Sequence, residues 1–301
     1  MIGALLALGL QAAASGPADD PIGSFIEENA ASVREMRIAA APADFCDGAF
    51  RQGSFLVCRF MPGARVELGE IDVTADADGY VMLAIPRRAP GEVPLRITYT
   101  REDGSSADIA ERLEIAAREY DLQHVDGVPQ STVTPDPSTL PRRQREYAQK
   151  QDAFNSVWDG TGFLDGFIPP AEGITTGIYG SARVYNNGHE GSPHWGLDWA
   201  NDVGTPVHAP AGGRVTLAEP DMYYEGGLIF IDHGQGLVSA FLHLSGVEVE
   251  AGDIVEQGQL IGQMGAGGRA TGSHLDWRVK LRNQFYADPA TLLELDPASL
   301  D

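Results

Sequence analysis

The stretch that decides the fold runs over residues 271–281 and reads TGSHLDWRVKL. Apolar and polar residues alternate in it: Leu275, Trp277, Val279 and Leu281 are apolar, and His274, Asp276, Arg278 and Lys280 are polar. A period of two is typical of a β-strand with one buried face. His274 and Asp276 then lie about 6–7 Å apart on the polar face, close enough to share one site. The same pattern also fits a strand whose polar face lies in water, so segments upstream must distinguish the two.

Composition limits the partners of the chain. It has 301 residues, enough for two ordinary domains, and a formal net charge of −22. A nucleic-acid partner is not expected, because binding a phosphate backbone requires Lys and Arg to replace its counterions. Beyond residue 20 no apolar run is long enough to span a bilayer.

Residues 1–15 (MIGALLALGLQAAAS) are typical of an export signal peptide, with a short apolar core followed by small residues suited to cleavage. No Lys or Arg precedes the apolar core, so a buried N-terminal helix is the alternative. No cysteine follows it, which argues against a lipid anchor. We expect an exported protein of the periplasm or cell envelope without a stable membrane anchor.

The only two cysteines, Cys46 and Cys58, lie close together in a region with strand-like patterning. In an oxidising compartment they would form a disulfide that closes a short loop, worth about 2–3 kcal/mol. A pair of buried free thiols is the alternative. Two cysteines alone cannot build a structural zinc site.

The first half of the chain predicts a small β-sandwich. Residues 16–125 form this N-terminal domain, which is expected to contain a short amphipathic helix near residues 21–36 before its strands. Its expected strands are residues 55–61, 64–73, 80–86, 93–100 and 109–122, separated by turn-forming stretches. His124, its one histidine, is most simply structural.

Residues 126–174 predict a connection between two domains. Residues 126–141 are rich in Pro, Ser and Thr, as in linkers. A helix is expected over residues 141–158, because Pro141 suits a first-turn position. Residues 175–301 then show glycine-punctuated strands, so the fold class is all-β with a short linking helix.

Two upstream segments supply further candidate site residues. The first reads PHWGLD and places His194 and Asp198 four residues apart. On a straight strand they would lie about 13 Å apart, so a bend at Gly196, where glycine tolerates unusual φ/ψ angles, is needed for them to share an ion. The second is His243, at the end of a strand predicted over residues 237–244. Alternation places it on the same strand face as Ser239 and Phe241.

Taken together, in this order and spacing, the three segments resemble the LytM/lysostaphin family of zinc endopeptidases that cut peptidoglycan cross-links. The family pattern is H-x-x-x-D, then H-L-S on a strand, then H-x-H after a Thr-Gly turn. Flanking stretches of this chain match as well: GTPV at 204–207, DHG at 232–234 and GDIV at 252–255. The resemblance covers residues 175–285 and implies a groove over an antiparallel sheet, the duplicated hybrid motif of that family.

Carried over position by position, the resemblance assigns the site residues. His194 and Asp198 correspond to the first two metal ligands. His243 and His274 correspond to the two catalytic histidines, with His274 as the base for the attacking water and His243 as the oxyanion partner, roles that can be exchanged. Asp276 stands where the family has the second histidine of H-x-H, as the third ligand.

Asp276 and Arg278 are the departures from the family pattern. Aspartate is an acceptable zinc ligand, with oxygen at about 2.0–2.2 Å. A His/Asp/Asp site around Zn²⁺ has no net charge, whereas His/Asp/His leaves it positive, which lowers the pKa of bound water further. Arg278, where many members have Glu, can restore the missing positive charge. We therefore expect one Zn²⁺ per chain.

The resemblance implies a zinc-dependent metalloendopeptidase, a hydrolase of peptidoglycan peptide cross-links in cell-wall remodelling. The alternatives are an inactive LytM-like regulator that binds peptidoglycan and activates a separate amidase, and a module that only docks on the wall. The bond that is cut, any protein partner and the oligomeric state stay open.

The remaining histidines are interpreted as structural or solvent-facing. His233 belongs to the Asp-His-Gly turn, and His189 and His208 are expected in loops. Residues 265–270 imitate a dinucleotide-binding fingerprint, but that reading requires a helix next and the sequence alternates as a strand.

Overall fold

The structure, a computed structural model, describes residues 45–101, 103–186 and 188–300. The expected signal peptide and the helix near residues 21–36 lie outside these residues. Antiparallel sheets dominate the fold, so the all-β prediction is confirmed. None of the helices in the described ranges is long and apolar enough to cross a membrane.

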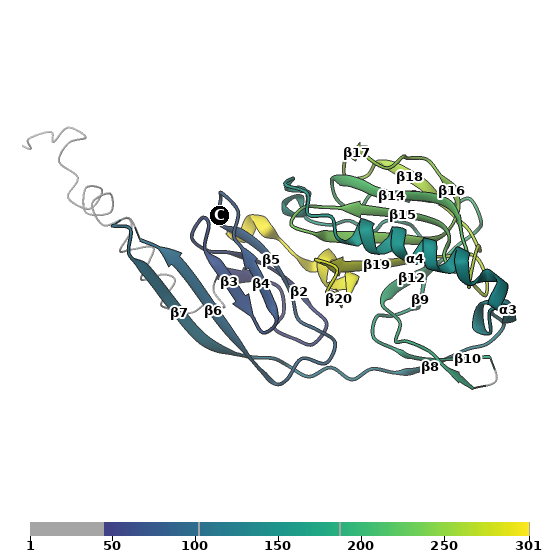
Figure 1. Ribbon diagram of the computed structural model, residues 1–301, viewed down its shortest axis with the longest axis horizontal. Helices are drawn as coiled ribbons and strands as arrows, with labels where there is room; N and C mark the ends of the chain where they lie inside the picture. Colours follow the sequence, from purple (N-terminus) through teal and green to yellow (C-terminus); the bar gives the residue numbers. More distant parts are fainter. Residues whose placement is uncertain (1–44, 102, 187, 301) are drawn as a thin grey trace, which may run out of the picture.

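A first β unit is built by strands β1 to β7 (Figure 1). One sheet contains β1 (Cys46–Asp47), β2 (Phe55–Arg59) and β5 (Tyr80–Ala84); the other contains β4 (Ile71–Thr74), β3 (Arg65–Leu68), β6 (Glu92–Thr100) and β7 (Ser106–Glu114). In β6 every second residue is buried, which is the period expected when one face of a strand covers a core. The stretch 64–73, predicted as one strand, is a hairpin of β3 and β4 around Gly69, which has φ +58°.

The two cysteines form a disulfide in this unit. Cys46 and Cys58 lie directly opposite each other on β1 and β2, with Cα atoms 4.0 Å apart. The bond ties the first described strand to the buried centre of the unit.

The connection between the two units is more structured than a flexible linker. Strand β8 (Leu122–Val125) pairs in parallel with β10 (Ala182–Tyr185), which also pairs with β11 (His189–Glu190). After β8 follow α3 (Gln130–Val133), η2 (Pro137–Thr139) and α4 (Leu140–Phe154). The helix predicted over residues 141–158 is therefore α4, and it ends four residues earlier than Trp158.

A ten-stranded sheet forms the second unit. Its strands are β9 (Ile174–Gly177), β12 (Gly196–Ala200), β13 (Pro206–His208), β14 (Gly213–Met222), β15 (Gly226–Asp232), β16 (Leu237–Val247), β17 (Ile254–Val255), β18 (Leu260–Met264), β19 (His274–Leu281) and β20 (Phe285–Ala287). The central order is β17-β14-β15-β16-β19-β12-β9, and β19 lies between β16 and β12. His189 and His208, which were expected in loops, lie in the short strands β11 and β13.

The two faces of this sheet bury different clusters. On one face Phe241, Leu275 and Trp277 belong to a large core that continues into the first β unit. On the other face the C-terminal end of α4 packs against the sheet, where the Phe154 and Phe230 rings lie 4.3 Å apart. Figure 1 shows α4 running along this face.

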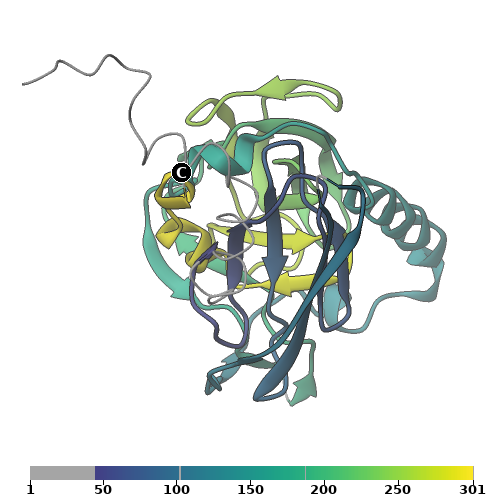
Figure 2. The same ribbon diagram turned by 90° about the vertical axis from the view of Figure 1, so that its left-hand side faces the viewer.

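The C-terminal segment joins the two units. It contains two short 3-10 helices, η4 (Pro289–Glu294) and η5 (Pro297–Leu300), which lie beside the first unit in Figure 2. Thr291 Oγ1 accepts a hydrogen bond of 3.0 Å from the Phe55 N–H, and Arg118 forms a 2.7 Å ion pair with Asp288. The first unit is thus docked on the second through buried polar contacts.

The Asp-His-Gly turn is a buried polar network. His233 Nδ1 lies 2.8 Å from the Gly212 carbonyl oxygen, which can only accept, so Nδ1 carries the proton. His233 Nε2 lies 2.7 Å from Ser239 Oγ, which accepts from the Trp277 indole N–H and therefore donates to the ring. Acceptance of this hydrogen bond by Nε2 requires a neutral imidazole, and burial lowers the pKa of His233 to about 4.

Acid should therefore destabilise the protein through His233. Its pKa is lower in the folded chain than the unfolded value of 6.5, so its contribution is complete above pH 6.5 and is lost as pH falls towards 4. Between pH 7 and 4.5 the free energy of unfolding should fall about 2–3 kcal/mol more in the wild type than in His233→Gln. Denaturant unfolding of both proteins at the two pH values measures this difference, and equal losses would contradict it.

Candidate metal and catalytic site

Strand β19 presents the predicted two faces. Leu275 and Trp277 are buried in the large core, while Asp276 lies on the opposite face. That face is not solvated, because Asp276 is only 1% exposed. The interpretation of residues 274–281 as a strand with a plain solvent face is therefore wrong.

The neighbouring strand β12 places a second carboxylate against the first. Asp198 is the direct antiparallel partner of Asp276, so both side chains lie on the same face. Like charges opposite each other destabilise a sheet, and burial increases the cost. The pair therefore requires positive charge nearby.

His194 completes a group of three possible ligands. It lies just before β12, held by hydrogen bonds between its backbone and those of Gly180 and Ser181. One ligand atom from each of His194, Asp198 and Asp276 lies within 4.8 Å of the others, and all three residues are buried.

The buried polar atoms of this group lack hydrogen-bond partners. His194 Nε2 lies 2.9 Å from Asp198 Oδ1, but the two atoms are not aligned for a hydrogen bond, and both are left unsatisfied together with His194 Nδ1. Buried polar atoms are nearly always paired. Converging unpaired nitrogen and oxygen atoms are what a divalent cation would satisfy, so this donor set fits a metal ion.

Two glycines make room for the carboxylates. A Cβ atom on Gly196 would lie 2.2 Å from Asp276 Oδ1, and one on Gly177 would lie 2.2 Å from Asp198 Oδ2. Gly196 is part of regular strand β12 and does not have a positive φ. The prediction of a bend at Gly196 through unusual φ/ψ angles is therefore wrong: the position needs glycine because the Asp276 side chain lies against it.

Arg278 binds the third candidate ligand. Its Nε donates to Asp276 Oδ1 at 3.0 Å, and its Nη2 donates to Oδ2 at 2.5 Å. Burial alone would raise the pKa of Asp276, but the charges of Arg278 and His194 outweigh it and hold that pKa well below its usual range. Asp276 is thus an anion, and a carboxylate has about four lone-pair positions, so it can accept from Arg278 and still bind a cation.

His243 reaches the site through an irregularity in β16. Regular alternation would place it with Ser239 and Phe241, which face the opposite side of the sheet. The pairing of β15 with β16 shifts register between Gly227 and Ile229, and His243 itself has φ +67°. This bulge turns the His243 side chain onto the face of Asp276. The predicted face of His243 is therefore wrong, although its proximity to the site is as expected.

The two histidines lie side by side at the mouth of the site. Their ring centroids are 4.7 Å apart. His243 Nδ1 lies 2.8 Å from the Gly267 carbonyl oxygen, and His274 Nδ1 lies 2.9 Å from that of Gly272. Since carbonyl oxygens only accept, both neutral rings carry their proton on Nδ1 and leave the Nε2 lone pair free. Burial, assisted by His274, lowers the pKa of His243 to about 4.

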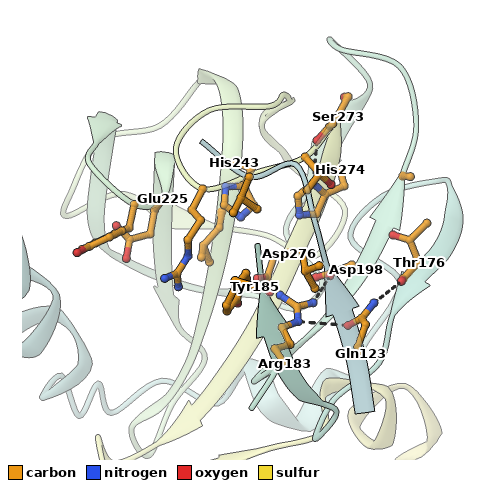
Figure 3. Close-up of a pocket in the computed structure, with 18 of the residues that line it drawn as sticks. Gln123, Thr176, Arg183, Tyr185, Asp198, Glu225, His243, Ser273, His274 and Asp276 are labelled. Atoms are coloured by element: carbon orange, nitrogen blue, oxygen red, sulfur yellow. Dashed lines mark hydrogen bonds and ion pairs between the residues drawn. The ribbon is translucent and has the colours of Figure 1, made fainter. Parts of the chain in front are cut away.

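A pocket of about 220 Å³ contains these groups. Figure 3 shows Asp198, Asp276, His243 and His274 directed towards it from β12, β16 and β19. Its walls also include Gln123, Val125 and Val128 from the connection between the units, whereas strands β1 to β7 contribute no lining residue among those described.

Sequence inspection missed two residues that support the site. Arg183 on β10 donates to Asp198 Oδ2 at 2.9 Å, and Gln123 on β8 accepts from Arg183 at 3.2 Å. Neither belongs to a motif, and no signal in the sequence links residue 123 to residue 183. The contact arises because β8 and β10 pair across 60 residues of chain.

Comparison with known proteins identifies the domain. Residues 192–289, which contain the three metal-ligand candidates and both histidines, match the model of peptidase family M23. The chain contains an M23 peptidase domain. A crystal structure described as a putative peptidase M23 from Pseudomonas aeruginosa superposes with a TM-score of 0.61 at 28% identity, covering 86% of this chain and 97% of that one.

Curated relatives match about a third of the chain. The peptidoglycan DD-endopeptidase ShyB of Vibrio cholerae is 37% identical over 92 residues, which are 31% of this chain and 21% of ShyB. Lysostaphin of Staphylococcus simulans is 34% identical over 102 residues, which are 34% of this chain and 20% of lysostaphin. The match thus spans about a fifth of the length of these relatives.

Gly196→Ala should weaken metal binding by the M23 domain. The new Cβ would lie 2.2 Å from Asp276 Oδ1 and 2.6 Å from the Trp277 carbonyl oxygen, so Asp276 must move away from His194. We expect at least a tenfold loss of Zn²⁺ affinity, equivalent to about 1.4 kcal/mol. Isothermal titration with Zn²⁺ measures it, with Gly91→Ala as the control because a Cβ there meets nothing within 4 Å. Unchanged affinity would contradict the assignment of Asp276 as a ligand.

Proposed function

We propose that the protein is a zinc-dependent endopeptidase that hydrolyses peptide cross-links of peptidoglycan outside the cytoplasm. The observation that carries the proposal is the convergence of three buried ligand candidates, two of which line one pocket together with His243 and His274. The activity named for ShyB, a peptidoglycan DD-endopeptidase, supports the choice of substrate. Export is inferred from residues 1–15 and agrees with the Cys46–Cys58 disulfide, since disulfides persist in oxidising compartments.

His194, Asp198 and Asp276 would hold one Zn²⁺. One nitrogen and two oxygen ligands suit zinc, and three protein ligands leave a fourth position open, as in catalytic zinc sites. When bound, zinc acts as a Lewis acid that polarises the scissile carbonyl group and makes water more acidic. Arg183 and Arg278 orient the two aspartates by binding their other oxygen lone pairs.

The two histidines would move the proton and stabilise the developing charge. His243 is buried and neutral with a free Nε2 lone pair, so it suits the general base that takes a proton from the attacking water. His274 is half-buried at the rim, where solvent can supply the proton that Nε2 would need in order to donate to the oxyanion. This exchanges the roles that were first assigned from the family resemblance.

Variants of the histidines and of the ligands should behave differently. His243→Ala and His274→Ala should each abolish hydrolysis but retain most of the zinc, because neither residue is assigned as a ligand. His194→Ala and Asp198→Ala should lose both. Zinc content of the purified proteins, measured beside digestion of purified cross-linked peptidoglycan, tests this. Loss of zinc in His274→Ala would make His274 a ligand and overturn the assignment.

The second candidate function is an inactive regulator that binds peptidoglycan and activates an amidase. The observation that favours it is the pairing of Arg278 with both oxygens of Asp276, which could replace a metal as the source of positive charge. Purified wild-type protein without stoichiometric zinc and without hydrolysis would support the regulator.

Asp276 and Arg278 should behave as a coupled pair. Asp276→Ala should lose the metal, whereas Asp276→His should restore the ligand of the family pattern and keep activity. Arg278→Glu should lower the rate more in the wild type than alongside Asp276→His, because only Asp276 needs the guanidinium. Kinetics of the double-mutant cycle measure the coupling, and additive effects would contradict it.

The same pair predicts metal preference. A second carboxylate makes a harder ligand set than His/Asp/His, so Mn²⁺ or Co²⁺ should displace Zn²⁺ more readily from the wild type than from Asp276→His. Competition titrations with Mn²⁺ or Co²⁺ on zinc-loaded wild type and Asp276→His measure how readily each protein gives up Zn²⁺.

A further inference from the structure

The pocket contains one basic side chain that has no acidic partner. Each of its three acids is already paired with a base: Asp198 with Arg183, Asp276 with Arg278, and Glu225 with Lys150. Lys150 lies outside the pocket lining, and the third lining arginine, Arg269, makes no hydrogen bond or ion pair through its guanidinium with any residue in the described parts of the chain. Arg269 is therefore a positive charge in the pocket that no neighbouring acid neutralises, although the chain carries −22 overall.

Two tyrosines hold Arg269 by their ring faces. The guanidinium carbon lies 5.0 Å from the centroid of the Tyr185 ring and 5.3 Å from that of Tyr224. Such cation–π contacts fix the plane of the guanidinium but use none of its N–H donors. The fork of donors is thus left for a ligand, and it matches the geometry of a carboxylate.

The backbone around Arg269 is also fixed. The Arg269 N–H donates to the Tyr224 carbonyl oxygen at 2.8 Å. Gly268 has φ +69°, and a Cβ there would lie 2.3 Å from the same oxygen, so the loop lies tight against the turn before β15. Little conformational entropy remains to be lost when Arg269 binds a ligand.

Arg269 lies close to the proposed chemistry. The same loop provides the Gly267 carbonyl oxygen that holds His243 Nδ1 at 2.8 Å. Arg269, His243 and His274 all line one pocket. A group bound by Arg269 would therefore belong to a residue at or next to the scissile bond.

We propose that Arg269 is a specificity-determining residue that binds a free carboxylate of the peptide substrate near the bond that is cut. The inference rests on the proposed function and narrows the substrate to cross-links with a carboxylate beside the scissile amide. Electrostatics favour this occupant, because an anionic group would meet an unneutralised guanidinium at Arg269, in a chain that is acidic overall.

Paired substrates test the proposal. The test compares two soluble cross-linked peptides that differ in a single group next to the scissile amide. One peptide has a free carboxylate there, and the other has the corresponding carboxamide. Hydrogen bonds to charged groups are worth enough to make kcat/KM about 10- to 100-fold higher for the acid in the zinc-loaded wild type. In Arg269→Gln this ratio should fall to near one, and in Arg269→Lys it should take an intermediate value.

Arg112→Gln is the matched control, because Arg112 is an exposed arginine on β7 paired with Glu92. It should keep the wild-type ratio. Melting temperature and zinc content are measured for every variant, and if Arg269→Gln does not fold, the Lys variant carries the test. No preference in the wild type, or a preference that persists in Arg269→Gln, would overturn the proposal; the latter would mean that the carboxylate binds the metal instead.

Failure of the proposed function can be separated from failure of this inference. If neither peptide is cut, the Kd values of both peptides for the wild type and Arg269→Gln give the same comparison. Tighter binding of the acid that depends on Arg269 supports the proposal without hydrolysis. Equal Kd values for acid and amide would overturn it.

Discussion

The structure of the site depends on one interaction: two buried carboxylates, Asp198 and Asp276, face each other across adjacent antiparallel strands. Alone, this pair would destabilise the sheet by repulsion and by the cost of removing both charges from water. The residues around the two carboxylates therefore either compensate their negative charge or leave room for their side chains. Arg183 and Arg278 bind the outer sides of the carboxylates, and the open side faces His194, where a divalent cation fits.

The same constraint explains the small residues at the centre of the sheet. Glycine is required at positions 177 and 196 because each carboxylate lies against a backbone with no Cβ. At these two positions glycine provides space for a carboxylate, whereas in hairpin turns it is needed because it tolerates a positive φ. The large core on the opposite face, centred on Trp277 and Phe241, holds the strands in the register that makes the two aspartates meet.

Positive charge and histidines are supplied by irregular parts of the chain. The bulge in β16 brings His243 to the site, and the loop before β19 holds both His243, through Gly267, and Arg269. Chemistry and substrate selection would thus be coupled through one short loop. The connection between the units adds Gln123 beside Arg183, so a segment outside the M23 match contributes to the pocket.

The sequence by itself determined the all-β class and the strand at residues 274–281, because alternation is a local property of the chain, and its resemblance to a known family supplied the group of ligand candidates. It could not determine which way His243 points, since the bulge depends on pairing with β15. The expected role of Arg278 in offsetting the charge of Asp276 agrees with their ion pair. The sequence could not predict why position 196 is glycine, that Arg183 binds Asp198, or that Arg269 has no acidic partner among the described residues. These features are set by contacts between strands distant in the chain, and no pattern along a single strand encodes them.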